Sequence, residues 1–174
     1  VEETIAVACE REIAVRDPVA AALHLPSVVD SEEQVDDRVA ELIEVLGLHA
    51  FAEKYVRELS TGSRRVVDLA CVLAHRPSVL LLDEPSSGIA QREAEALGPL
   101  LLRIRDMTGA SVLIIEHDVP LLTSISDRMI ALDLGRIVTT GPPTEVIHHP
   151  DVVASYLGES DVAVARSGPR QSDT

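Results

Sequence analysis

The stretch Val79–Pro85 reads VLLLDEP and decides the fold of this chain. Four consecutive apolar residues without alternation predict a strand that is buried on both faces. Pro85 cannot donate a hydrogen bond to a sheet ladder, so the strand should end just before it. Asp83 and Glu84 then lie at the carboxyl end of a central strand, where open α/β sheets hold their ligands. Carboxylates there need a partner, such as a metal ion, a phosphate-bound Mg²⁺ or a water molecule to activate.

A second apolar run, Ser111–Glu116, precedes His117, and a helix is expected between the two runs, from about Gln91 to Met107. Strand, helix and strand in this order form a βαβ unit, in which the two strands are parallel. Asp83, Glu84 and His117 should therefore emerge at the same carboxyl edge of the sheet. This expectation follows from topology alone.

Upstream of the first strand, Leu59–Gly62 reads LSTG. Ser60 is expected to cap a helix that runs from Ser63 to about Ala74. Backbone N–H groups at a helix N-terminus bind anions well, and a glycine beside them permits close approach. An ordinary serine-capped helix explains the same residues, so this stretch by itself leaves both interpretations open.

Taken together, LSTG at 59–62, LLLDEP at 80–85 and a second strand that ends at His117 resemble the motifs of the ATP-binding subunit of ATP-binding-cassette (ABC) transporters. The order and the separations are those of the family. The resemblance extends from residue 1 to about residue 157. It implies an α/β fold of the P-loop NTPase type found in ABC proteins, with a parallel sheet core and a helical subdomain.

The resemblance implies a role in ATP hydrolysis for three residues at the sheet edge. Asp83, in the Walker B position, would hold Mg²⁺ through a water molecule. Glu84 would act as the general base, and His117 would contact the γ-phosphate and the attacking water. For each of them, a merely solvated residue at a strand end is the alternative.

The resemblance also implies a dimer. Ser60, Thr61 and Gly62 match the signature motif, which in this family contacts the ATP held by the facing subunit of a head-to-tail pair. Ser63 stands where the family usually has glutamine. Ala90 and Gln91 stand where the loop after the glutamate usually has aspartate and often proline. That aspartate helps to couple the two sites across the dimer, so this chain departs from the family at the coupling position.

Three features of the family are absent from the sequence. A phosphate-cradling loop reads GxxxxGK[ST], but the single lysine, Lys54, is followed by Tyr55 and has no glycine immediately before it. The adenine-stacking aromatic residue and the glutamine loop are also absent. The simplest expectation is a C-terminal portion whose first strands and phosphate loop lie upstream. Such a chain should expose a sheet edge and an unfilled core, and should not hydrolyse ATP alone.

The expected organisation has three parts. Residues 1–58 form part of the helical subdomain, with one helix over about 1–13 and another that starts at the capping-box pattern Ser31–Gln34 and ends at Leu46. The segment between them is expected to be a loop or a broken helix. Residues 59–157 form the signature helix and the catalytic α/β core. Residues 158–174 are rich in serine, glycine and aspartate, and are expected to be disordered.

Composition narrows the range of partners. The net charge of −14 argues against nucleic acid, because phosphate binding needs a basic face. No apolar run approaches the ~20 residues that span a bilayer. Cys9 and Cys71 are isolated and are expected to be small core residues. The resemblance implies a cytoplasmic subunit at the inner face of the cell membrane, held there by a transmembrane transporter domain that docks on the helical subdomain.

Two classes of function stay open. The first is the ATP-hydrolysing component of a transporter. The pieces Gly141–Ile147 and Val153–Gly158 resemble the ATPases of branched-chain amino-acid importers, which implies branched-chain amino acids or related small solutes. The second is a truncated or non-catalytic regulatory or interaction module that only retains ATPase-like residues. A third class, ABC proteins that act on DNA or ribosomes, is disfavoured by the acidic charge.

Overall fold

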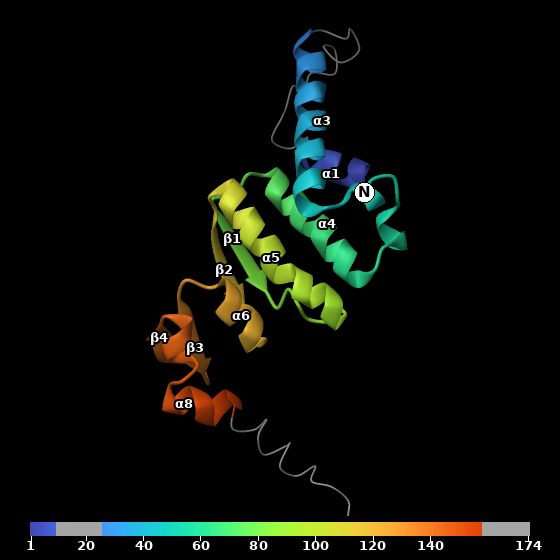
Figure 1. The fold of residues 1–174 in the computed structure, drawn as a ribbon. Helices are drawn as coiled ribbons and strands as arrows, with labels where there is room; N and C mark the ends of the chain where they lie inside the picture. The colour runs from blue at the N-terminus through green and yellow to red at the C-terminus, as the bar shows by residue number, and fades with distance from the viewer. Residues whose placement is uncertain (10–25, 158–174) are drawn as a thin grey trace, which may run out of the picture. The chain divides into compact units, whose positions relative to one another are not determined.

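The computed structural model describes residues 1–9 and 26–157. The chain divides into two compact units, the first from Val1 to His117 and the second from Asp118 onward. The first unit holds Ser60–Gly62, called the signature stretch below, and both predicted strands of the βαβ unit. Figure 1 shows the elements of both units along the chain.

The amino-terminal part of the first unit is helical. Its elements are α1 (Glu2–Cys9), α3 (Pro26–Leu46), the 3₁₀ turns η1 (His49–Phe51) and η2 (Val56–Glu58), and α4 (Thr61–Ala74). Helix α1 packs against both α3 and α4. Its inner face carries Ile5 and Cys9, which lie one turn apart and are both buried. Cys9 and Cys71 are free thiols, as expected for small residues in or near the core.

The start of α3 differs from the prediction. The capping-box pattern predicts a start at Ser31, but the helix begins at Pro26, so Ser31 lies inside it. Proline suits the first turn of a helix because its missing N–H needs no partner there and its φ angle is already helical. Residues 26–30 of the expected loop are therefore helical. The rest of that loop, residues 10–13 of the first expected helix and the tail from residue 158 lie outside the described residues.

Ser60 caps helix α4 as predicted, but the helix begins at Thr61, two residues before the expected start at Ser63. The side chain of Ser60 accepts a hydrogen bond from the Ser63 backbone N–H at 3.1 Å and so caps the helix. Its buried side comprises Gly62, Val67, Leu69, Ala70, Leu73 and Ala74. The helix thus presents a continuous apolar side to the core of the unit.

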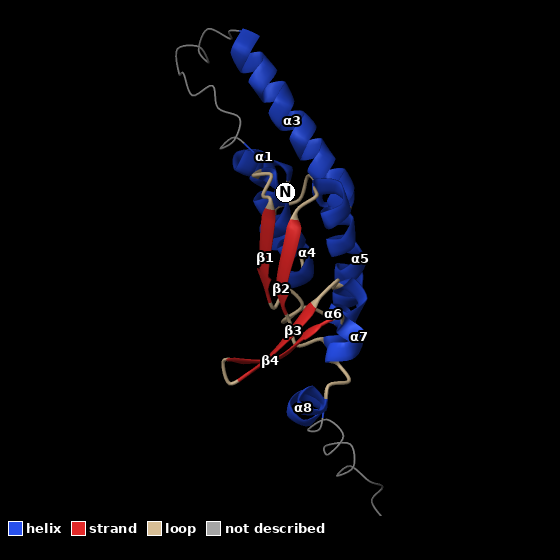
Figure 2. Ribbon diagram, turned by 90° about the vertical axis from the view of Figure 1, so that its left-hand side faces the viewer, coloured by secondary structure: helices blue, strands red, loops and turns tan. Residues whose placement is uncertain are grey.

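Strands β1 (Val79–Asp83) and β2 (Ser111–Ile115) are parallel, and helix α5 (Gln91–Thr108) connects them. Their register pairs Asp83 with Ile115, so both carboxyl ends fall at the same level. Gly109, at φ +65°, ends α5 in the left-handed conformation that glycine adopts without strain. The predicted βαβ unit is confirmed (Figure 2).

The prediction that β1 is buried on both faces is wrong. Leu80 is 2% exposed, whereas Leu81, on the opposite face, is 69% exposed. Leu113 and Ile115 of β2 are also exposed on alternate positions. The face that carries Leu80 is covered by helices of the same unit. In residues 1–9 and 26–117, no element covers the other face, which leaves it bare.

The second unit contains an antiparallel hairpin and short helices. These elements are α6 (Val119–Ile125), β3 (Met129–Asp133), β4 (Arg136–Gly141), α7 (Pro143–Val146), α8 (Pro150–Val152) and the π-helical turn η3 (Val153–Leu157). Strands β3 and β4 pair around Leu134 and Gly135, whose φ angles are both positive. A small core forms around Ala131, Val146 and Val152. Among the described residues, no helix combines the length and the apolar character needed to cross a membrane.

Candidate functional site

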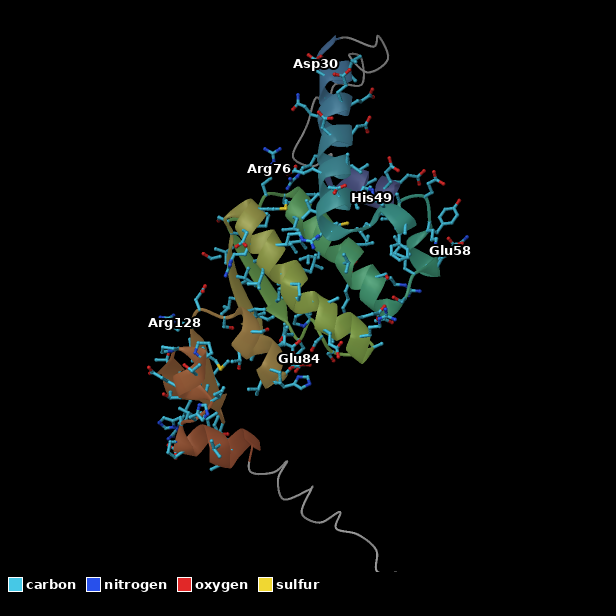
Figure 3. The ribbon with its side chains drawn as sticks, in the orientation of Figure 1. Asp30, His49, Glu58, Arg76, Glu84 and Arg128 are labelled. Atoms are coloured by element: carbon cyan, nitrogen blue, oxygen red, sulfur yellow. The ribbon has the colours of Figure 1, made fainter. Side chains whose placement is uncertain are left out.

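The carboxyl ends of β1 and β2 bring the predicted edge residues onto one end of the sheet. Asp83 is the last residue of β1, and the Glu84 N–H donates to the carbonyl oxygen of Ile115 at 2.8 Å. Asp83 and Glu84 are exposed, and the His117 side chain is 71% exposed. Figure 3 marks Glu84 at this end of the unit. All three residues therefore reach solvent from the same edge, as their topology predicts.

The backbone of Glu84 adopts an unusual conformation. Its φ angle is +43°, in the left-handed region. For a residue with a Cβ, this conformation costs about 1–2 kcal/mol. Contacts around the loop must compensate for that cost.

Arg65 of α4 supplies two of these contacts. Its Nη1 donates to the carbonyl oxygen of Glu84 at 2.9 Å and to that of Pro85 at 2.7 Å. Arg65 lies five residues after the helix cap Ser60. One helix therefore carries the signature stretch at its start and holds the main chain of the predicted general base a little further along.

Glu116, which follows β2, supplies another contact. Its side chain is 0% exposed. Oε1 accepts a hydrogen bond from the Ser86 N–H at 2.7 Å, and Oε2 accepts one from the His117 N–H at 3.1 Å. The imidazole Nδ1 of His117 lies 3.6 Å from Oε2. A single carboxylate therefore joins the loop after β1 to the residue after β2.

The signature stretch contacts the start of α5. Besides capping α4, Ser60 donates from its hydroxyl to Glu93 Oε1 at 2.7 Å. Gly62 is buried, and a Cβ built on it would lie 2.5 Å from Glu93 Oε2. Thr61 is exposed. The glycine at position 62 thus leaves room for a carboxylate, which lies at a helix N-terminus that favours anions.

A cavity of about 660 Å³ lies between α4, β1 and α5. Its lining is mostly apolar and includes Val66, Leu69, Leu80, Leu97 and Leu101. This cavity matches the expectation of an unfilled core. Its polar lining residues include Arg65, Asp83 and Glu93, so it borders the site without forming a separate polar centre.

Sequence reasoning missed three residues of this region: Arg65, Glu93 and Glu116. Glu116 stands between an apolar strand and His117, where a charged residue is ordinarily a solvated strand end. Glu93 lies in the first turn of α5 and Arg65 in the second turn of α4, where each is typical of an exposed helix position. Their partners lie 33 and 19–20 residues away along the chain, so local patterns carry no signal for them.

The donor set at the edge suits a magnesium ion that keeps its own waters. In residues 1–9 and 26–157, no three His, Cys, Asp or Glu side chains gather closely enough to hold a metal by themselves. Magnesium is ordinarily held by one or two carboxylates together with waters and substrate phosphates. The exposed carboxylate of Asp83 offers oxygen atoms of the kind that such a site uses.

The chain is similar in sequence to a known protein family and to several of its members. Residues 4–87 match the family model described as "ABC transporter". The chain is 33% identical over 138 residues to the high-affinity branched-chain amino acid transport ATP-binding protein LivG of Escherichia coli (strain K12), covering 79% of this chain and 54% of LivG. It is 32% identical over 142 residues to BraF of Pseudomonas aeruginosa, which has the same description, covering 82% of this chain and 56% of BraF.

The fold is also similar to that of a solved structure. CbiO1 from Clostridium perfringens, described as part of the ABC transporter complex CbiONQ, superposes with a TM-score of 0.67 at 23% identity. The similarity covers 91% of this chain and 57% of that chain. This chain spans about half the length of the curated relatives it matches.

Proposed function

We propose that this chain, which belongs to the ABC transporter family, is part of an ATP-hydrolysing subunit that powers transport across a membrane. The observation that carries the proposal is the common edge of β1 and β2, where Asp83, Glu84 and His117 reach solvent together. These are the residue types that hydrolysis of a nucleoside triphosphate needs around its metal and its attacking water.

Each edge residue has a distinct role in this proposal. Asp83 would orient Mg²⁺ through a water molecule of its shell, and the ion would neutralise charge on the phosphates. Glu84 would accept a proton from the attacking water. His117 would donate a hydrogen bond toward the γ-phosphate. Their exposure supports the proposal, because the nucleotide must approach from solvent.

The signature stretch would act on a second nucleotide. Ser60, Thr61 and Gly62 lie at the N-terminus of a 14-residue helix, whose dipole and first-turn N–H groups favour phosphate. In the proposed head-to-tail dimer this end faces the ATP of the other subunit. Arg65, in the same helix, contacts the main chain of Glu84, so the two nucleotide sites would share one rigid element.

The relatives' names suggest the transported solute and the partner. LivG and BraF are described as branched-chain amino acid transport proteins, and we propose branched-chain amino acids or related small solutes for this chain. Residues 1–58 would form part of a helical subdomain that receives a transmembrane transporter domain, and residues 59–157 the catalytic part. Such docking would hold the subunit at the inner face of the cell membrane.

The 174 residues contain no phosphate-cradling loop, so we propose that they do not hydrolyse ATP by themselves. Such a loop would come from polypeptide outside this sequence. The bare face of β1 and β2 supports this, because a parallel sheet is ordinarily covered on both faces. The same absence favours the second candidate, a non-catalytic module that binds a partner through its helices.

Calorimetric titration with millimolar Mg·ATP tests this proposal on the chain itself. We expect no binding heat from the 174 residues, and robust turnover once a segment with the phosphate loop is supplied. In that longer protein Glu84→Gln should abolish turnover, while the exposed Glu95→Gln should leave it unchanged. Turnover that survives Glu84→Gln would refute the catalytic proposal. Absence of turnover in the longer protein would favour the non-catalytic module.

A further inference from the structure

We propose that Glu116 is a positioning residue for ATP hydrolysis, because its buried carboxylate holds the loop after β1 and the residue after β2 in one arrangement. In this way it aligns Glu84 with His117. The inference rests on the function proposed above, since it takes Glu84 and His117 as the residues that act on ATP. Glu116 acts through the main chain of the protein and does not itself reach the nucleotide.

The burial of Glu116 is the first observation behind this inference. Its side chain is 0% exposed, while that of the adjacent His117 is 71% exposed. Burial of a carboxylate is strongly unfavourable unless hydrogen bonds compensate for the lost water. Here the Ser86 N–H reaches Oε1 at 2.7 Å and the His117 N–H reaches Oε2 at 3.1 Å. Charge-assisted bonds of this kind are stronger than neutral ones.

The bond to Ser86 restrains the loop that carries the proposed general base, Glu84. Ser86 lies two residues after Glu84, whose φ of +43° is maintained only under external constraint. The loop is held at the Glu84 N–H by Ile115, at the Glu84 and Pro85 carbonyls by Arg65, and at the Ser86 N–H by Glu116. Release of one contact would let the side chain of Glu84 shift, and a general base tolerates little displacement.

The chemistry of the contact requires a carboxylate. Both oxygens accept hydrogen bonds from main-chain N–H groups. Glutamine has nearly the same shape but only one acceptor oxygen, and its NH₂ group is a donor. In Glu116→Gln, either the Ser86 or the His117 N–H must therefore face a second donor. The substitution breaks one bond while leaving the volume unchanged.

Native-state hydrogen exchange of the 174-residue chain tests the contact without any nucleotide. We expect the amide of Ser86 or His117 to exchange roughly tenfold faster in Glu116→Gln than in the parent chain. Glu95→Gln, an exposed glutamate of α5, is the matched control and should change neither rate. If Glu116→Gln does not fold, Glu116→Asp replaces it, since the shorter side chain cannot span both amides. Unchanged exchange at both amides overturns the inference.

Steady-state kinetics of the longer subunit that carries the phosphate loop test the consequence. We expect Glu116→Gln to lower kcat roughly tenfold and to leave KM for ATP nearly unchanged. A purely structural role would lower the melting temperature without this separation of kcat from KM. If Glu116→Gln keeps full kcat while Glu84→Gln abolishes turnover, the positioning role is wrong and the proposed function stands. Turnover that persists in Glu84→Gln overturns the proposed function and the inference with it.

Discussion

Gly62 and Glu93 form a contact that a double-mutant cycle can measure. A Cβ built on Gly62 lies 2.5 Å from Glu93 Oε2 and 2.7 Å from its Cδ, distances that real Cβ atoms essentially never show. Gly62→Ala must therefore displace the Glu93 carboxylate. The displacement breaks the 2.7 Å hydrogen bond that the Ser60 hydroxyl donates to Glu93 Oε1.

Two opposing effects determine how much Gly62→Ala changes the free energy of unfolding. Loss of the Ser60–Glu93 hydrogen bond costs about 1 kcal/mol. Replacement of glycine by alanine in a helix gains at most about 1 kcal/mol. In the parent chain, Gly62→Ala should therefore change the free energy of unfolding by less than about 0.5 kcal/mol. In a Glu93→Ala chain the clash is absent, so the same substitution should raise it by about 0.5–1 kcal/mol.

Urea denaturation of the parent chain, the two single variants and the double variant gives the coupling energy. We expect a coupling energy of about 1 kcal/mol, because Gly62→Ala should be more favourable in the Glu93→Ala chain than in the parent chain. The same cycle with Glu95, an exposed residue of the same helix, is the control and should give no coupling. A Gly62–Glu93 coupling below about 0.3 kcal/mol, within the additivity error, would refute the reasoning. Gly62 would then have no intrachain role beyond that of a helix residue.

Three further predictions concern other parts of the chain. Leu134 is 94% exposed with φ +45° and precedes Gly135 in the hairpin turn, so Leu134→Asn should raise the free energy of unfolding by about 1 kcal/mol, and Leu134→Ala should not. Ile104 is 0% exposed, and Ile104→Ala should lower the free energy of unfolding by about 3 kcal/mol in urea denaturation. Burial raises the pKa of the Cys9 and Cys71 thiols, so at pH 8 both should be alkylated more slowly than in the urea-unfolded chain. This difference in alkylation rate should shrink as the pH rises through the raised pKa values, and equal rates at pH 8, measured by mass spectrometry, would contradict the assignment.

Local patterns were sufficient to predict the elements that position the site. The apolar runs that end at Asp83 and before His117 predicted two parallel strands, and Ser60 predicted the start of a helix. The patterns were insufficient where a stronger local signal determines the start of a helix, or where the tertiary environment determines which face of a strand is buried. Pro26 begins α3 five residues before the capping box at Ser31. The apolar run of β1 cannot reveal that one of its faces is bare, because burial depends on residues elsewhere in the fold.

The candidate site was predictable in its residues but not in its contacts. The position of Glu84 at a strand end follows from Pro85 and the βαβ topology. Its positive φ angle does not, because nothing in the sequence marks a glutamate for the left-handed region. The hydrogen bonds of Arg65 and Glu116 depend on how α4 and β2 approach the loop, which is a property of packing over long sequence separations.

The bare face of β1 and β2 also affects the chain in solution. Val79, Leu81, Leu113 and Ile115 are each more than half exposed. The stretches Val79–Leu82 and Ser111–Ile115 are short, uncharged and free of proline, a composition that favours stacking of sheets from different molecules. Light scattering by the purified chain should therefore grow with protein concentration and with time. Leu81→Lys would place a charge in the middle of that face and should delay aggregation, while Leu80, on the covered face, continues to pack in the core.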